Sequence, residues 1–478
     1  MESVEIVKAL RSLGLGRGDI VLLHSSLISL GYVEGGADAV IKAFLDVIGK
    51  CGTLLVPAFG ALGVIPETLK KRRDAVFSDC PVGTVAAVGA DAKALCADHW
   101  KADTAHGKDT PFTRLAEKGG YICLLGVDQD RNTSLHSVEA LLELPYLSPV
   151  TRTFKTPDGR EVTKTWNYYP GPHRDFIGLD HILEESGAMK IMRIGNAQVR
   201  LIKSDLMFET LLALGSGDPA FALCENPSCA DCVRQRAAIF AADMEKESFR
   251  LTASSRLAGR YVPEMVENLK RAGISLIELD YLQGKACALA PVKTLKRAVE
   301  DLNEAGIQVS ALRVPAVPDD PAKLPELVTE CGIRRVILPL ANSEKAAKAL
   351  VKKQIEVSFV NLCQTSLSAK EQMIAYAKKF DCDLTFNNAN FVLAGEMPFL
   401  QSYRTGHFIK FMNQLDLIDC KWDGEATSLA FGNGEIKELI SILRCHNFNG
   451  FFCLGGGMPY PGSLEDAVND FRNLLAAM

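Results

Sequence analysis

Residues 18–27 read GDIVLLHSSL, an apolar run that ends in a histidine and two serines. The apolar residues Ile20, Val21, Leu22 and Leu23 follow one another, which is typical of a strand buried on both faces of a parallel sheet. We therefore expect a strand over Ile20–His24 in an open α/β sheet. Ligands of such sheets bind beyond the carboxyl ends of the strands, so His24 and the serines after it are candidate binding residues.

Further elements of an α/β fold surround this strand in the first half of the chain. Helical periodicity predicts helices over Val4–Leu13 and Ala37–Val47. Apolar runs predict strands over Thr53–Val56 and Tyr121–Gly126. Alternation around Asp158-Gly159 predicts a β-hairpin with a two-residue turn.

The second half alternates short β-rich runs with amphipathic helices. Eight such runs recur at a spacing of roughly 20–40 residues, which predicts a (β/α)8 TIM barrel. They are Phe249–Ala253, Ser275–Leu279, Gln308–Leu312, Arg335–Leu338, Glu356–Asn361, Asp383–Phe386, His407–Met412 and Gly450–Leu454. The charged stretch Asp243–Ser248 is the expected boundary, so we expect an α/β domain over residues 1–243 and a barrel over residues 244–478.

The composition excludes several classes of protein. The 478 residues are 47% hydrophobic and 23% charged, with a net charge of −5, which excludes a disordered or collagen-like chain. Without a basic excess we expect no nucleic-acid partner and no membrane partner. The sequence has neither an 18-residue apolar run nor a signal-peptide pattern, so we expect a cytoplasmic location with most of the 14 cysteines reduced.

Three cysteines form a close cluster between the two halves. Cys224, Cys229 and Cys232 stand within nine residues. Three thiolates and a fourth ligand would make a structural zinc site. No second Cys-x2-Cys pair and no His-x3-His pair follows, so a zinc site and metal-free reduced thiols both remain open.

The segment Pro81–Val85 is a second candidate for ligand binding. Its Gly83-Thr84 pair is expected to begin a helix, where free backbone N–H groups favour a phosphate. The same pair at a helix start commonly serves as a plain cap, so both interpretations stay open.

The order of motifs in the first half resembles the aminoglycoside 3-N-acetyltransferase family, a group of acetyl-CoA-dependent enzymes. The matching segments are HSSLISLG (24–31), VEGGADAV (33–40), GTLLVP (52–57), PVGTVAAVG (81–89), DTPF (109–112), LLGVDQDRNTSLHSVEALL (124–142) and IGNAQVRL (194–201). The resemblance covers about residues 3–215 and implies an α/β/α acetyltransferase domain. Cys80, where the family often has histidine, and Ala58-Phe59-Gly60 depart from the family pattern and leave the acetylated amine open.

The resemblance also implies a catalytic pair. His136 and Glu139 are three residues apart after the expected helix cap Asn132-Thr133, which places them on one helix face. A primary amine is an ammonium ion at neutral pH, so its acylation needs a base such as histidine. The carboxylate would orient the imidazole or hold the cationic substrate, and Asp175 is expected to add negative charge to the amine site.

Acetyl-CoA is the expected cosubstrate. The residues expected to bind it are His24, Ser25, Ser26, Ser29, Gly83, Thr84, Val85 and Phe112. Ser25, Ser26 and Thr84 are also candidate donors to the oxyanion of the tetrahedral intermediate. The expected function is transfer of an acetyl group to an aminoglycoside or a related amine, with His136 as general base. The expected partners are then the amine substrate and CoA. Antibiotic resistance is one biological context for this activity. The sequence leaves open whether the protein forms a homo-oligomer.

The second half resembles the sugar phosphate isomerase/epimerase barrels. Asn387–Glu396 and Gly432–Ile436 carry this resemblance, which implies a divalent metal held at the strand ends. Glu278 fits that ligand set, but Asn361 and Asn387 stand where acids are expected, and amides are poor ligands for a catalytic divalent ion. We therefore expect a barrel without the catalytic metal set. Isomerase or epimerase activity is the alternative function, and a CoA-binding protein without turnover is a third.

Overall fold

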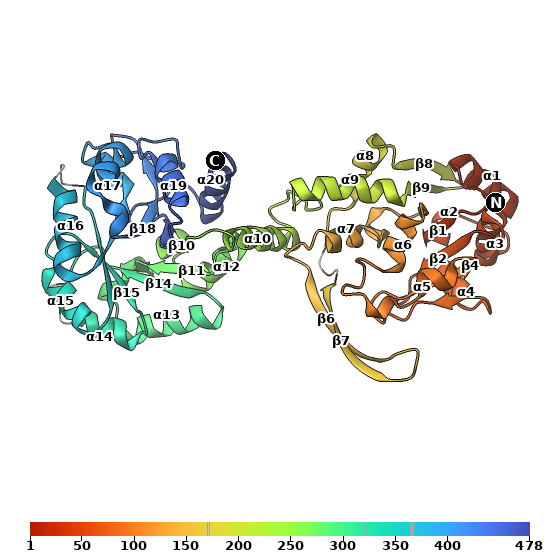
Figure 1. The fold of residues 1–478 in the computed structure, drawn as a ribbon, viewed down its shortest axis with the longest axis horizontal. Helices are drawn as coiled ribbons and strands as arrows, with labels where there is room; N and C mark the ends of the chain where they lie inside the picture. The colour runs from red at the N-terminus through yellow and green to blue at the C-terminus, as the bar shows by residue number, and fades with distance from the viewer. Residues whose placement is uncertain (170, 172, 319, 322, 364–367) are drawn as a thin grey trace. The chain divides into compact units, whose positions relative to one another are not determined.

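The computed structural model describes residues 1–169, 171, 173–318, 320–321, 323–363 and 368–478. The chain forms two compact units, residues 1–239 and residues 240–478 (Figure 1). The boundary falls within α10 (Ala230–Met244). Among the helices of the described ranges, none combines the length and apolarity that a bilayer crossing requires.

A seven-stranded sheet with the order β3-β4-β2-β1-β5-β9-β8 forms the centre of the first unit. Its strands are β1 (Ile20–Ser25), β2 (Thr53–Pro57), β3 (Val76–Phe77), β4 (Val85–Gly89), β5 (Tyr121–Leu125), β8 (Met189–Ile194) and β9 (Ala197–Lys203). Strand β1 pairs in parallel with β2 and β5, so the carboxyl ends of these three strands meet at one edge. The outer strands are antiparallel to their neighbours.

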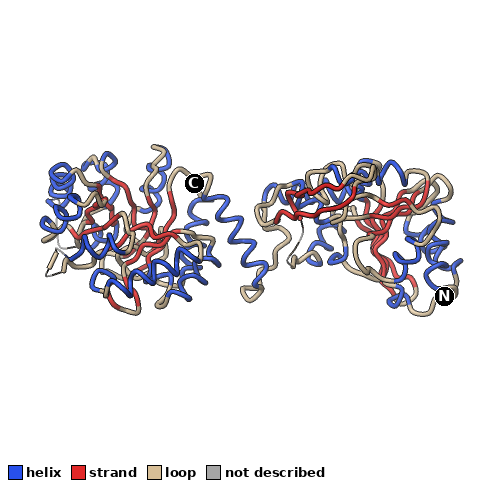
Figure 2. The backbone as a smooth tube through the Cα atoms, turned by 90° about the horizontal axis from the view of Figure 1, so that it is seen from below, coloured by secondary structure: helices blue, strands red, loops and turns tan. Residues whose placement is uncertain are grey.

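Helices cover both faces of this sheet. Alternate residues of β1 belong to different apolar clusters: Val21 and Leu23 to one, Ile20 and Leu22 to the other. The first cluster includes α1 (Ser3–Leu13) and α3 (Gly36–Ile48), and the second includes α6 (Pro111–Glu117), α7 (Leu135–Leu141) and α9 (Ser204–Gly217). The result is a three-layer α/β/α unit, whose strands and helices can be followed in Figure 2. Shorter helices are α2 (Leu27–Leu30), α4 (Val64–Lys70), α5 (Ala92–Cys96) and α8 (Asp180–Glu185).

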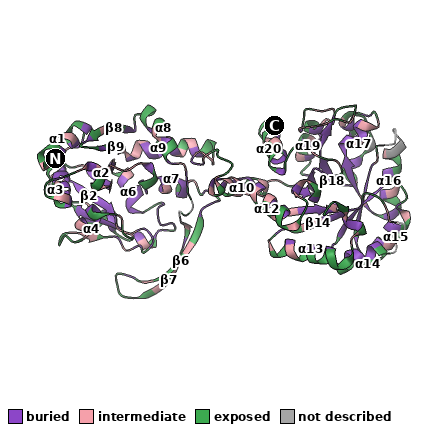
Figure 3. Cartoon of the chain, turned by 180° about the vertical axis from the view of Figure 1, so that it is seen from behind, coloured by how far each residue is buried: buried purple, intermediate pink, exposed green. Residues whose placement is uncertain are grey.

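The expected hairpin is present, but its turn is longer than predicted. Strands β6 (Ser148–Lys155) and β7 (Glu161–Tyr169) pair antiparallel and are largely exposed (Figure 3). The N–H of Thr156 donates to the carbonyl of Arg160 at 2.9 Å, which leaves a three-residue loop, Pro157–Gly159. The prediction of a two-residue turn at Asp158-Gly159 was wrong because such a turn needs a positive φ at its first central residue, whereas Gly159 has a positive φ and Asp158 does not.

The second unit is a closed barrel of eight parallel strands with helices between them, as expected for a (β/α)8 barrel. The strands are β10 (Arg250–Ser254), β11 (Leu276–Leu279), β14 (Gln308–Arg313), β15 (Arg335–Pro339), β16 (Glu356–Val360), β17 (Asp383–Asn387), β18 (Met412–Leu417) and β21 (Phe451–Leu454). The principal helices are α12 (Val262–Ala272), α13 (Val292–Glu304), α14 (Lys323–Glu330), α15 (Glu344–Lys352), α16 (Ser368–Phe380), α17 (Asn388–Leu393), α19 (Ile436–Cys445) and α20 (Leu464–Ala476).

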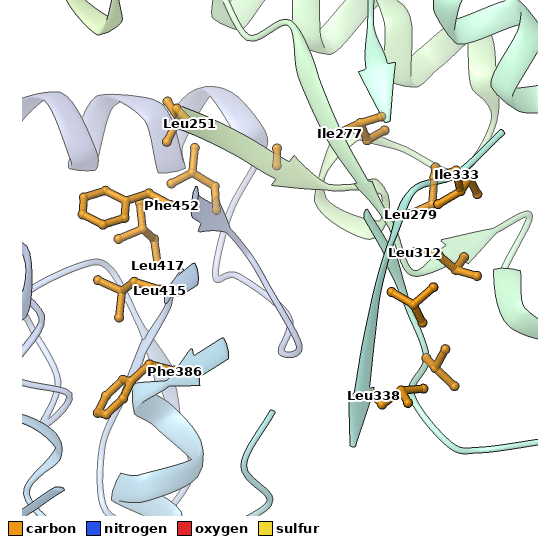
Figure 4. Packing of buried hydrophobic residues seen from close by; sticks show 14 of the residues in the cluster. Leu251, Ile277, Leu279, Leu312, Ile333, Leu338, Phe386, Leu415, Leu417 and Phe452 are labelled. Carbon is orange, nitrogen blue, oxygen red and sulfur yellow. The ribbon is translucent and has the colours of Figure 1, made fainter. Parts of the chain in front are cut away.

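Strand β18 shows how the barrel divides apolar and polar side chains. Leu415 and Leu417 belong to the apolar cluster that also contains helix residues such as Leu439 (Figure 4). Gln414 and Asp416 alternate with them and contact polar residues of other strands. The predicted strand over His407–Met412 was wrong, because residues 408–410 form a short 3-10 helix and the buried alternation begins only at Met412.

Candidate active site

A cavity of about 460 Å³ opens where the carboxyl ends of β1 and β2 meet the start of α7. Its lining includes His24, Ser25, Phe59, His106, Asp130 and His136. The parallel arrangement of β1, β2 and β5 creates this edge, and the loop after β5 carries the chain across it to α7. We call this space the His136 cavity.

His136 and Glu139 are in direct contact. They lie at i and i+3 on α7, and His136 Nδ1 is 2.8 Å from Glu139 Oε2. An ionised carboxylate only accepts hydrogen bonds, so Nδ1 donates to it. In the neutral imidazole the lone pair therefore lies on Nε2, and a base needs such a lone pair to take up a proton.

The helix starts later than its predicted cap. Helix α7 begins at Leu135, and Ser134 occupies the cap position. Asn132 instead accepts a hydrogen bond from the N–H of Ser134 at 3.2 Å, and its amide donates to Gln129 at 2.9 Å. Asn132 therefore shapes the loop before the helix, and His136 remains within the first turn.

Glu139 is fully buried and is held by two further residues. Arg174 Nε donates to Glu139 Oε1 at 2.6 Å, and the Tyr146 hydroxyl donates to the same oxygen at 3.1 Å. Burial raises the pKa of Glu139, but His136 and Arg174 outweigh burial and lower that pKa below its ordinary value. Glu139 is therefore a carboxylate at neutral pH. Sequence reasoning missed Arg174 and Tyr146, since no spacing pattern links them to α7.

Aromatic and imidazole rings surround His136. The ring of Phe176 lies 5.0 Å from that of His136, and the ring of His106 lies 6.0 Å from it. His106 stacks on Phe112 at 5.0 Å. Burial lowers the pKa of His106 well below its ordinary value, and His136 lowers it further, so His106 is neutral. His106 was not predicted from the sequence.

Of the residues predicted at the end of β1, His24 and Ser25 line the cavity. Burial lowers the pKa of His24 to about 3, so its imidazole is uncharged at neutral pH. The Ser25 hydroxyl has no hydrogen-bond partner among the described residues. Ser26 and Ser29 contact each other at 2.8 Å between their hydroxyl oxygens, and Ser26 caps the short helix α2.

The prediction that Gly83-Thr84 begins a helix was wrong. Gly83 ends a turn over residues 81–83, Thr84 follows it without regular structure, and Val85 begins strand β4. The Thr84 hydroxyl donates to the carbonyl of Cys80 at 2.6 Å, and the Val85 N–H donates to Ser78 at 2.9 Å. The cause is tertiary: β4 pairs antiparallel with β2 and so fixes an extended backbone. Val85 and the predicted CoA contact Phe112 are both fully buried in the apolar core.

Acidic groups lie near the cavity, but Asp175, the acid predicted from the sequence, is not part of the lining. Asp130 lines the cavity, whereas Asp175 lies nearby in the segment after residue 171. Residues 170 and 172, on either side of residue 171, lie outside the described residues. Burial raises the pKa of Asp130, and the charges of Asp128 and Asp175 raise it further. Arg131, which also lines the cavity, and His173 oppose that rise, so acidic and basic groups both lie at this end of the cavity.

The three predicted cysteines do lie together. The thiols of Cys229 and Cys232 are in contact with each other and with that of Cys224. His173 is the fourth member, with its Nδ1 3.9 Å from Cys229 Sγ. No local pattern revealed this fourth member, because His173 stands more than 50 positions before the cysteines.

Known proteins match the part of the chain that carries His136. The sequence profile of the family described as aminoglycoside 3-N-acetyltransferase matches residues 22–62 and 60–214. Aminoglycoside N(3)-acetyltransferase IV from Salmonella sp is 30% identical over 233 residues, which cover 45% of this chain and 87% of that protein. The chain belongs to the aminoglycoside 3-N-acetyltransferase family.

The chain spans less than two thirds of the length of three other curated relatives in the aminoglycoside 3-N-acetyltransferase family. Aminoglycoside N(3)-acetyltransferase VII from Streptomyces paromomycinus is 37% identical over 176 residues, or 29% of this chain and 60% of that protein. Matches to two further relatives cover 65% and 60% of their lengths. The crystal structure of aminoglycoside acetyltransferase AAC(3)-IVa, apoenzyme, is 28% identical, with a TM-score of 0.45 over 50% of this chain and 97% of that one.

The residues that the aminoglycoside 3-N-acetyltransferase profile covers include His136, Glu139 and Arg174. Cys224, Cys229 and Cys232 lie beyond its last matched residue, as does the whole barrel. The match therefore covers the His136-Glu139 pair and leaves the cysteine cluster and the second unit without a family assignment.

The barrel interior holds a buried network of charges where the isomerase resemblance implies a metal. Arg313 bridges two carboxylates, with its Nε 2.5 Å from Glu278 Oε1 and its Nη2 2.6 Å from Asp416 Oδ1. Burial raises the pKa of Asp416 to about 6, with Arg313 opposing that rise. Asp416 is the second-last residue of the seventh barrel strand and was missed because that strand was predicted several residues too early.

Proposed function

We propose that this protein transfers an acetyl group from acetyl-CoA to an amine of an aminoglycoside or a related amino compound. The names of the family and of its relatives support the substrate class. The contact between His136 Nδ1 and Glu139 Oε2 is the observation that carries the proposal, because it leaves Nε2 of a cavity-lining histidine as a base.

In the proposed reaction the amine nitrogen attacks the carbonyl carbon of the acetyl thioester. His136 Nε2 accepts the proton that the amine loses as the new N–C bond forms. The C–S bond then breaks to release CoA as the thiolate, and the His136 imidazolium gives its proton to that thiolate, which restores the base. Glu139 accepts the hydrogen bond from Nδ1 and stabilises the imidazolium. The chain's own contribution is thus a positioned base with a fixed tautomer.

Two other residues of the cavity have proposed roles. Ser25 is the candidate oxyanion donor, because it lines the cavity and its hydroxyl has no hydrogen-bond partner among the described residues. The Thr84 hydroxyl donates to the carbonyl of Cys80, and Ser26 is not part of the lining. Asp130, supported by Asp128 and Asp175, would hold the ammonium groups of the substrate. Neutral His24 and His106 would bound the site without repelling a cation.

The barrel is proposed to lack a catalytic divalent ion. Arg313 already supplies the positive charge between Glu278 and Asp416, so a divalent cation would have to displace a guanidinium from two short ion pairs. The two ion pairs therefore favour acetyl transfer over sugar isomerisation as the activity of the chain.

The test is thiol release from acetyl-CoA by the full chain with a panel of aminoglycosides and simpler amines. We expect turnover with at least one polyamine sugar and a loss of turnover in His136→Asn. Sugar isomerisation with added Mn²⁺, in the absence of any acetyl transfer across the panel, would overturn the proposal.

A further inference from the structure

The cysteine cluster has a feature that the sequence alone did not reveal: a histidine from a distant segment completes it. The ligand atoms of His173, Cys229 and Cys232 all lie within 4.8 Å of one another. The Cys224 thiol is in side-chain contact with both other thiols. Two thiols and one imidazole therefore share the short separations of a metal site, and Cys224 is the adjacent thiol that could supply the fourth ligand.

The spacing of these atoms matches tetrahedral zinc coordination. Zn–S bonds of about 2.3 Å and Zn–N bonds of about 2.0–2.1 Å place a sulfur and a nitrogen ligand about 3.6 Å apart across a tetrahedron. Cys229 Sγ and His173 Nδ1 are 3.9 Å apart, close to that separation. Small shifts of the side chains would complete the coordination.

The backbone around the cluster is fixed by residues of α10. The N–H of His173 donates to Asp231 at 3.1 Å, and Gln235 donates to the carbonyl of His173 at 2.9 Å. Arg236 donates to the carbonyl of Cys224 at 2.7 Å. These bonds position both the histidine and the first cysteine, as outer partners of metal ligands do.

We infer that Cys224, Cys229, Cys232 and His173 bind one structural Zn²⁺ ion in a closed Cys₃His site. Four protein ligands leave no open position for substrate, so the ion has a structural role. It would tie the segment that begins at His173 to the start of α10. Arg174, the residue after the histidine ligand, is the one that holds Glu139, so the ion would support the catalytic pair from a distance.

The direct test is metal analysis of the full chain, purified without chelator from zinc-supplemented cells. Mass spectrometry of the metal content is expected to give about one zinc per chain, and X-ray absorption is expected to give three sulfur neighbours at about 2.3 Å and one nitrogen at about 2.0–2.1 Å. Less than about 0.2 zinc per chain after anaerobic reconstitution with Zn²⁺ would overturn the inference. So would iron in place of zinc, a disulfide within the cluster, or a coordination shell of four sulfurs.

Substitutions identify the ligands. Cys229→Ser and Cys232→Ser are expected to lose the zinc, and His173→Ala to release it to a chromogenic chelator at least about tenfold faster than the unchanged protein. Cys51→Ser and His181→Ala, at exposed positions outside the cluster, are the matched controls and should keep both stoichiometry and release rate. Unchanged zinc content in both cysteine variants would contradict the assignment.

A second measurement uses the unchanged protein, so its outcome does not depend on whether a variant folds. Co²⁺ exchanged for Zn²⁺ in the unchanged protein should give thiolate-to-cobalt charge-transfer absorption and the visible bands of a tetrahedral ion. Absence of these bands, with all four side chains intact, would overturn the inference.

Discussion

The Nε atom of Arg174 lies 2.6 Å from Oε1 of Glu139, although the two residues stand 35 positions apart in the sequence. Both side chains are almost fully buried, with exposed fractions of 1% and 0%. His136 and the guanidinium together lower the pKa of the buried carboxyl and keep it ionised, and the carboxylate orients His136. One ion pair therefore links the stability of the first unit to the geometry of the proposed base.

Replacing His136 tests the proposed base. His136→Ala is expected to lower kcat by about 10²–10⁴-fold, because a positioned base contributes that factor to proton transfer. Affinity for CoA, measured by calorimetry, should stay nearly unchanged, since the thioester is expected to lie against the strand ends. His181→Ala on α8, at an exposed position, is the control. Retention of more than about a third of kcat with a good amine would rule out His136 as the base.

Replacing Arg174 tests the buried ion pair. Arg174→Ala leaves the Glu139 carboxylate with an uncompensated buried charge, so the free energy of unfolding of the first unit should fall by about 3–5 kcal/mol. Denaturant titration of the full chain followed by tryptophan fluorescence measures this change. Arg72→Ala removes an exposed arginine that pairs with Asp74, and it should cost less than about 1 kcal/mol. If the two substitutions lowered the free energy of unfolding equally, burial would not explain what the Arg174 ion pair contributes to stability.

The buried histidine of β1 predicts a pH dependence of stability. Burial lowers the pKa of His24 to about 3, whereas the unfolded chain has the ordinary value near 6.5. Between these values the unfolded state binds the extra proton, so the free energy of unfolding should decrease as the pH falls below 6.5. At pH 5 the protonation of this one group in the unfolded state lowers the free energy of unfolding by about 2 kcal/mol.

Thermal denaturation of the full chain from pH 7 to pH 5 measures that dependence. His24→Leu removes the titrating group from the strand and should flatten the decrease, while His446→Leu, on an exposed loop of the second unit, should leave it unchanged. An identical pH dependence in His24→Leu would exclude His24 as the source.

The Arg313 network predicts the response of the barrel to divalent ions. Millimolar Mn²⁺ or Mg²⁺ should leave the thermal midpoint of the unchanged protein within about 1 °C, because an ion that binds neither the folded nor the unfolded state does not change the stability. Arg313→Ala should lower the free energy of unfolding of the barrel by about 3–5 kcal/mol, since it leaves two buried carboxylates without their partner. Lys345→Ala on the exposed side of α15 is the control. A rise of several degrees in the unchanged protein with Mn²⁺ would contradict the prediction.

Local patterns of the sequence were sufficient for most of the secondary structure. The apolar run Ile20–Leu23 predicted β1, and the periodicity of Val4–Leu13 predicted α1, each to within a residue or two. A strand buried on both faces gives a continuous apolar run, and a helix buried on one face gives a helical period, so burial determines both patterns directly. The spacing of His136 and Glu139 placed both on one face of α7 for the same reason. The prediction for Gly83-Thr84 was wrong because the conformation of this pair depends on pairing between β4 and β2, which no local pattern contains.

The sequence by itself determined two α/β units, a His-Glu pair on one helix and a group of three cysteines, since each of these depends on residues close together along the chain. Only the tertiary structure decided that Arg174 and Tyr146 hold Glu139, that His173 joins the cysteines, and that Arg313 bridges Glu278 and Asp416. Each of those contacts joins side chains from separate elements. Their distances follow from how sheets and helices pack, and packing is a property of the whole fold rather than of any short segment.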